Sequence, residues 1–170
     1  TEPEIMGLIG EILLLRGHLA ERIGLSEALR SWSGQELTHK DFSFDNTWME
    51  AKAVSRGSQT VKISSLEQLD SDVDGELAVH SLEKMSTAYN GITLNKLIFE
   101  TRNMFLSGDE QDAFMAKVAL QGYEYNNYYD DFVYEISSFK RYSVNSDFPK
   151  LTHRDLPVAI RKAMYEISLV

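Results

Sequence analysis

Cysteine is absent from this 170-residue chain, which excludes disulfide bonds, thiolate nucleophiles and cysteine-ligated zinc or iron–sulfur sites. Long hydrophobic runs are also absent, because no stretch reaches the roughly 18 apolar residues that a membrane helix needs. The most apolar segment, 5–15, contains Glu11 and follows acidic rather than basic residues, so it makes a poor signal peptide. We therefore expect a cytoplasmic protein that makes no contact with a membrane.

Basic side chains are scarce relative to acidic ones. Against 26 Asp and Glu there are 17 Lys and Arg, which gives a net charge of −9 and disfavours a phosphate-binding surface. The acidic excess is uneven, because residues 61–110 hold four basic and nine acidic side chains, whereas 111–170 hold seven and eight. Acids that bind a metal would add to the net charge without repelling a ligand. The charge therefore weakens a nucleic-acid-binding interpretation without excluding it.

Nothing in the composition divides the chain into parts. Only three prolines occur, 43% of residues are hydrophobic, and the length fits one folded domain. Hydrophobic periodicity predicts helices over 4–23, 27–32 (capped by Ser26), 93–106, 109–121 and 156–164. Alternating or short apolar patterns predict strands over 41–54, 61–64, 76–82, 132–144 and 165–170, with a helical turn at 66–69. This order of elements indicates an α/β or α+β fold.

The segment 41–54 alternates with period two around Asp45-Asn46, a pair that suits a tight hairpin turn. With these two residues as the loop, Asp41 lies opposite Glu50. One face of the hairpin then carries an apolar set suited to packing under a helix, namely Phe42, Phe44, Met49, Ala51 and Ala53. The other face carries Asp41, Glu50 and Lys52.

Two opposed carboxylates repel each other unless a cation compensates them. Lys52 lies two residues from Glu50 on the same face and supplies one cation, and a divalent metal would supply more. This combination suits metal-assisted phosphodiester hydrolysis, because carboxylates bind Mg²⁺ and a lysine can orient water or neutralise developing charge. On residue types alone, a surface hairpin whose acids point into water is an equally acceptable interpretation.

Asp41, followed nine positions later by Glu50-Ala-Lys52, resembles the PD-(D/E)XK nuclease signature. The chain is most similar to one bacterial branch of that superfamily, a domain of unknown function. The shared features are Gly7-Leu-Ile-Gly-Glu11, Trp32 before Asp41-Phe42, Ser64-Ser-Leu-Glu-Gln-Leu69, and Phe148-Pro-Lys-Leu-Thr followed by Asp155-Leu-Pro. One departure is Lys40, which stands where the signature has proline. The resemblance implies a restriction-endonuclease-like α/β core, a central mixed sheet flanked by helices, with a helical and β C-terminal appendix.

The same resemblance implies a DNA endonuclease that depends on Mg²⁺ or Mn²⁺ and serves in restriction or phage defence. Asp41, Glu50 and Lys52 are then the catalytic residues, and the two acids are also metal ligands. Glu11 is expected as an auxiliary metal ligand, and the alternative for it is a boundary glutamate paired with a basic residue elsewhere.

Two further polar residues accompany this set. Gln68 is expected as an auxiliary site residue, because it matches the glutamine of the related proteins, and the alternative for it is a plain helical-turn residue. His39 lies two positions before Asp41, but an oxygen-ligated Mg²⁺ site does not need it. We therefore expect His39 at the surface or behind the metal ligands.

Other interpretations stay open. The net charge favours a binding or assembly module of a defence complex that keeps the nuclease fold without turnover, and an unrelated α/β protein could carry the pattern by chance. We expect one domain over residues 1–170; relatives with an additional N-terminal region suggest that it is the C-terminal part of a longer protein. DNA is the expected partner, together with restriction or defence-system proteins. A homodimer is a hypothesis, since two active sites cut a duplex most simply.

Overall fold

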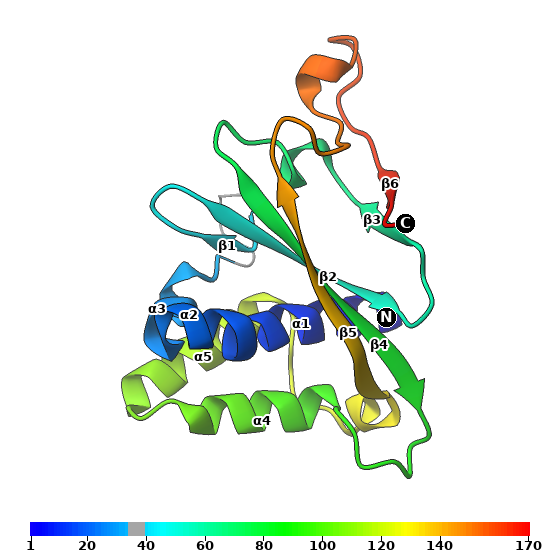
Figure 1. Ribbon diagram of the computed structural model, residues 1–170. Helices are drawn as coiled ribbons and strands as arrows, with labels where there is room; N and C mark the ends of the chain where they lie inside the picture. Colours follow the sequence, from blue (N-terminus) through cyan, green and yellow to red (C-terminus); the bar gives the residue numbers. More distant parts are fainter. Residues whose placement is uncertain (34–39) are drawn as a thin grey trace.

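A mixed sheet of four strands, in the order β1-β2-β4-β5, forms the centre of the computed structural model, which describes residues 1–33 and 40–170 (Figure 1). Its strands are β1 (Phe42–Ser43), β2 (Trp48–Ser55), β4 (Gly75–Met85) and β5 (Val133–Val144). β2 runs antiparallel to β1 and parallel to β4, and β5 runs antiparallel to β4. The parallel pair requires a crossover connection, and β3 (Thr60–Ile63) and the 3₁₀ turn η2 (Leu66–Gln68) provide it.

Helices cover one face of this sheet. The first is α1 (Glu2–Leu14), which continues through the π-helical turn η1 (Leu15–Leu19) into α2 (Ala20–Ile23), as expected for 4–23. The others are α3 (Leu25–Ser31), α4 (Leu94–Met104) and α5 (Gly108–Leu120), and Figure 1 shows this helical layer below the sheet. The apolar stripe of α1 packs with the sheet in one buried core, which includes Ile9, Ile12, Trp32, Phe42, Ala78 and Phe114.

The opposite face of the sheet is covered by a second, two-stranded sheet. Here β3 pairs antiparallel with β6 (Tyr165–Ser168), although about 100 residues separate them in the sequence. A separate buried core fills the space between the two sheets, and it includes Trp48, Val61, Ile63, Leu77, Val79 and Ile167. The expected α/β class, with a mixed sheet flanked by helices, is therefore confirmed, and β6 belongs to the C-terminal appendix.

The hairpin has the predicted register. Phe42 pairs with Met49 and Ser43 with Trp48, so Asp45 and Asn46 form the loop. The expected apolar face also holds, because Phe42, Met49 and Ala51 are buried in the core under the helices. In the described chain, no helix is long and apolar enough to cross a membrane.

Two predicted helical features are wrong. Residues 156–164 form no helix; the adjacent segment contains one 3₁₀ turn, η4 (His153–Asp155), and Leu156 has extended backbone angles (φ −125°, ψ 154°). Pro157 follows Leu156 and disfavours the helical region for it, and Val158 remains 96% exposed, so no core supports a helix there. The second error is the cap of α3, which begins at Leu25 after Gly24 (φ 86°) rather than after Ser26.

Candidate active site

The fold brings the predicted residues of the hairpin together at a cavity of about 440 Å³. Asp41 precedes β1, while Glu50 and Lys52 lie on β2, and all three line this cavity. Glu11 reaches it from α1 and Gln68 from η2. All five residues predicted for the site therefore converge, although they come from segments up to 57 residues apart.

Asp41 and Glu50 are bound to each other's strands. The backbone N–H of Asp41 donates to Oε1 of Glu50 at 3.0 Å, and the backbone N–H of Ala51 donates to Oδ2 of Asp41 at 2.8 Å. β1 begins only at Phe42, opposite Met49, so Ala51 of β2 lies beyond its start and donates its backbone N–H to the Asp41 carboxylate instead. The opposition of the two acids thus follows from the hairpin register, as the sequence predicted.

Burial makes these two acids poor at holding negative charge. Glu50 is only 3% exposed, and burial raises its pKa well above the ordinary value, with a further increase from the neighbouring Asp41. Burial also raises the pKa of Asp41 to about 6, although the Ala51 N–H and the Lys52 ammonium oppose the increase. A cation bound between the two carboxylates would reverse both shifts.

Glu11 adds a third carboxylate from the helical layer. Its Oε1 accepts hydrogen bonds from Nε1 of Trp32 at 2.9 Å and from Nε2 of Gln121 at 3.3 Å. Burial, followed by the charge of Asp41, raises the pKa of Glu11 to about 8. No basic partner holds this carboxylate among its described hydrogen bonds, so its environment differs from that of a boundary ion pair.

Lys52 and Gln68 are in direct contact. The Lys52 ammonium donates to Oε1 of Gln68 at 2.9 Å, and the same oxygen accepts the backbone N–H of Ser64 at 3.0 Å. The Ser64 bond fixes the amide of Gln68, which in turn directs Nζ of Lys52. The crossover segment between β2 and β4 therefore contributes a polar group to the cavity.

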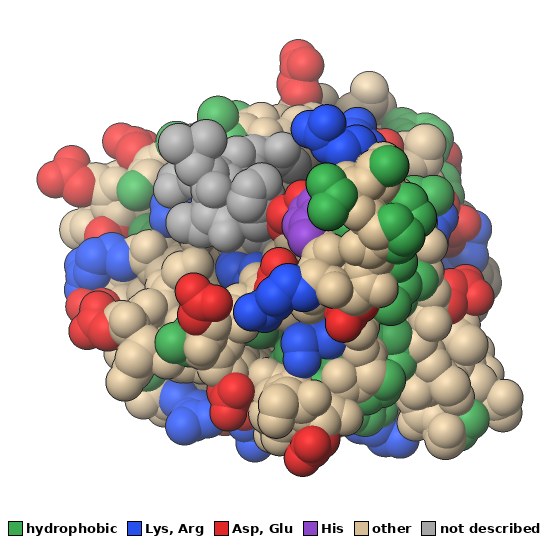
Figure 2. Space-filling model, turned by 90° about the horizontal axis from the view of Figure 1, so that it is seen from above, with side chains coloured by type: hydrophobic (Ala, Val, Ile, Leu, Met, Phe, Trp, Pro, Cys, Tyr) green, Lys and Arg blue, Asp and Glu red, His purple; other side chains and the backbone are tan. Residues whose placement is uncertain are grey.

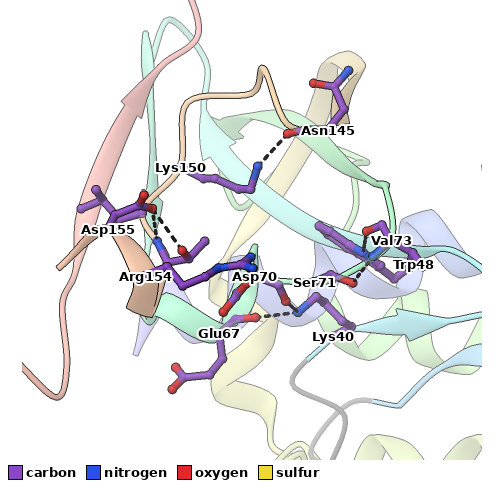
Figure 3. Close-up of polar contacts among 12 residues, drawn as sticks. Lys40, Trp48, Glu67, Asp70, Ser71, Val73, Asn145, Lys150, Arg154 and Asp155 are labelled. Carbon is purple, nitrogen blue, oxygen red and sulfur yellow. Dashed lines mark hydrogen bonds and ion pairs between the residues drawn. The ribbon is translucent and has the colours of Figure 1, made fainter. Parts of the chain in front are cut away.

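Lys40, next to the first acid, has a structural role that the sequence did not reveal. Its ammonium donates to the backbone carbonyls of Glu67 (2.6 Å) and Asp70 (2.8 Å) and lies 5.0 Å from the ring centroid of Trp48 (Figure 3). These bonds tie the start of β1 to the crossover segment. Asp70 also meets Arg154 at 3.8 Å, which links the C-terminal segment to the same region. The predicted position of His39 lies outside the described residues.

The chemistry of the cavity suits a hard divalent cation. Mg²⁺ prefers oxygen ligands, keeps several waters, and is commonly held by one or two carboxylates plus substrate phosphates. Asp41 and Glu50 supply two such carboxylates at one cavity, and the charge of Asp41 raises the pKa of Glu50. Within 1–33 and 40–170, no three His, Asp or Glu side chains form a ready-made metal cluster. The donor set therefore fits a two-carboxylate site, and a ligand role for Glu11 stays a prediction.

Trp32 and Gln121 hold Glu11 from behind the cavity lining, and the sequence assigned neither of them a role. Trp32 appeared only as part of the resemblance, and Gln121 carried no signal because 110 positions separate it from Glu11.

Comparison with known families gives one result. A family described as "Putative PD-(D/E)XK family member, (DUF4420)" matches residues 1–170, the whole chain. No curated protein and no solved structure was found to match.

Proposed function

We propose that this chain, which belongs to the DUF4420 family, hydrolyses phosphodiester bonds of DNA with the help of Mg²⁺ or Mn²⁺. The observation that supports the proposal is that Asp41 N–H donates to Glu50 and Ala51 N–H donates to Asp41, with both acids and Lys52 lining one cavity. Neighbouring carboxylates that repel each other and are shielded from water destabilise a fold. A bound cation would offset this cost.

Each of the five predicted residues at the cavity has a role in this proposal. Asp41 and Glu50 hold the metal, with Glu11 as a further ligand. When bound, such a metal polarises the phosphoryl group and lowers the pKa of a bound water. Lys52 carries a positive charge that can contact a phosphate oxygen and stabilise the negative charge that develops there. Gln68 keeps the ammonium of Lys52 in place.

A second candidate is a binding module that keeps this fold without turnover. The net charge of −9 supports it. So does the face in Figure 2, where acidic side chains lie among the basic ones and do not leave a purely basic surface. The retained acids and lysine support catalysis instead, because a module without turnover does not need all three.

A cleavage assay separates the two candidates. Supercoiled plasmid and single-stranded DNA are incubated with the protein in Mg²⁺, Mn²⁺ or EDTA, and Lys52→Ala is compared with Lys96→Ala, an exposed lysine on α4. We expect metal-dependent cleavage that Lys52→Ala reduces by at least 100-fold and Lys96→Ala leaves within twofold. If folded wild-type protein leaves every substrate intact, the binding-module interpretation replaces the nuclease proposal.

The biological process and the oligomeric state are also proposals. The resemblance to restriction-type nucleases supports restriction or phage defence, and a homodimer would allow both strands of a duplex to be cut. A sedimentation mass of one chain at working concentration would contradict the dimer.

A further inference from the structure

The carboxylate of Glu11 is oriented by two donors that lie outside the hairpin. The indole N–H of Trp32 and the amide of Gln121 both donate to the same oxygen, Oε1, at 2.9 and 3.3 Å. Two donors on one oxygen restrict rotation of the carboxylate about its last bond. Glu11 lines the same cavity as Asp41 and Glu50, so this restriction fixes the direction in which its carboxylate faces the cavity.

Trp32 is itself held rigidly. Its side chain is 1% exposed, and its ring lies 6.3 Å from that of Phe42 and 6.0 Å from that of Phe114 (centroid distances). Its backbone carbonyl accepts from Nζ of Lys117 at 2.5 Å, and the same ammonium also donates to the carbonyl of Leu29 at 2.7 Å. The indole thus has a fixed position from which to hold Glu11.

The second support comes from the end of α5. Lys117 lies in the last turn of that helix, and Gln121 is its C-terminal cap residue. One end of α5 therefore fixes the backbone at Trp32 and contacts Glu11 directly, so both donors depend on the packing of α5 against α1 and α3.

We propose that Trp32 is a positioning residue for the metal site, assisted by Gln121, and that it acts by holding the Glu11 carboxylate toward Asp41 and Glu50. This inference rests on the proposed function in one respect, namely that the cavity binds a divalent metal. Partners that orient a ligand typically change metal affinity 10- to 100-fold when they are removed.

The chain contains a matched control for a lost indole hydrogen bond. Trp48 is also buried, at 3% exposed, and its indole N–H donates to the backbone carbonyl of Val73 at 3.0 Å. Trp48→Phe therefore loses a comparable bond in the other core and does not touch Glu11. Trp32→Phe keeps an aromatic ring beside Phe42 and Phe114 but removes the N–H donor and part of the ring volume, and Trp48→Phe loses the same two things.

The test measures Mn²⁺ binding to the folded protein by the electron paramagnetic resonance signal of free Mn²⁺, with no DNA present. Wild type is compared with Trp32→Phe, Trp48→Phe, Gln121→Leu and Glu11→Gln, and the Tm of each variant without metal is recorded. We expect about 10-fold or greater weakening in Trp32→Phe and Glu11→Gln, a smaller weakening in Gln121→Leu, and a change within twofold in Trp48→Phe.

Each outcome has one meaning. Unchanged Mn²⁺ affinity in both Trp32→Phe and Gln121→Leu overturns the inference, and so does equal weakening in Trp48→Phe. If Glu11→Gln binds Mn²⁺ as wild type does, Glu11 is not a ligand; the inference then fails while the nuclease proposal stands. If wild type binds no Mn²⁺ at all, the proposed function fails as well. Should Trp32→Phe not fold, Gln121→Leu decides, since Gln121 is only partly buried.

Discussion

The backbone N–H of Asp41 donates to the side chain of Glu50 at 3.0 Å, and the residue after Glu50 returns a backbone N–H to Asp41 at 2.8 Å. Each carboxylate therefore accepts a backbone N–H from the segment that carries the other acid, and Glu50 is buried while Asp41 is partly buried. The arrangement fixes two carboxylates that repel each other when both are ionised, and this repulsion leads to the first prediction.

Glu50→Gln is expected to leave the metal-free protein equally or more stable, because it removes a buried charge and keeps an acceptor for the Asp41 N–H. The same variant is expected to lose the metal-dependent gain in stability. In wild type we expect that gain to be about 2.7 kcal/mol at 100-fold metal excess over the Kd. Thermal scans with and without Mn²⁺ measure both effects. A variant that keeps the full metal-induced shift would show that the two acids do not share an ion.

Lys52→Met is expected to act in the opposite direction on the metal-free protein. Asp41 and Glu50 lose the charge of Lys52, which lowers the pKa of both, and Gln68 loses a donor, so we expect a cost of about 1–3 kcal/mol of unfolding free energy. Urea titration measures it. Lys62→Met, which removes an exposed lysine lining the same cavity from β3, is the control and should change stability by less than about 0.5 kcal/mol. Equal losses in the two variants would contradict this role of Lys52.

The buried imidazole of His80 is expected to lower the stability of the protein in acid. Burial lowers its pKa to about 4, its buried Nδ1 has no hydrogen-bond partner among the described residues, and its ring centroid lies 4.4 Å from that of Phe139. The unfolded chain takes up the proton near pH 6.5, whereas the folded chain resists it until about pH 4. Stability due to His80 is thus full above pH 6.5 and falls as the pH drops toward 4, by up to about 3 kcal/mol.

His80→Leu tests this assignment, because the other titrating groups are the same in both proteins. The variant is expected to match wild type near pH 7.5 and to exceed its unfolding free energy by an increasing margin between pH 6.5 and 4. Parallel pH profiles of the two proteins would contradict the assignment.

Replacement of two glycines of α1 by alanine is expected to change stability differently. A Cβ on Gly10 would lie 3.2 Å from Cβ of Ala53 on β2, whereas a Cβ on Gly7 would meet no atom of residues 1–33 or 40–170 within 4 Å. Gly7→Ala should therefore stabilise the protein by about 0.5–1 kcal/mol through helix propensity. Gly10→Ala should lose that gain, because α1 must move away from the sheet and carry Glu11 with it. Denaturant midpoints of the two variants measure the difference, and equal gains would show that α1 does not need this close approach.

The hairpin was predictable because its information is local. Alternation and the Asp45-Asn46 loop fix the register, and the register alone places Asp41 opposite Glu50. Gln68 could be assigned only by resemblance, since no local pattern says that the crossover returns it to Lys52.

Contacts that depend on tertiary packing could not be predicted from the sequence. Gln121 meets Glu11 only because α5 packs beside α1 and α3, and nothing in the sequence around position 121 indicates that partner. Tertiary packing also explains the wrong prediction of a helix at 156–164. The apolar residues of this segment are periodic, but Val158 stays exposed and packing does not stabilise a helix there.

The central claim is that Asp41 and Glu50 share one divalent metal ion. Crystals soaked in Mn²⁺ and measured at the manganese absorption edge test it most directly. The account predicts an anomalous peak within about 2.0–2.5 Å of a carboxylate oxygen of each of these residues, at the cavity that Glu11 and Lys52 also line. Mn²⁺ bound elsewhere, with no peak between Asp41 and Glu50, would contradict it.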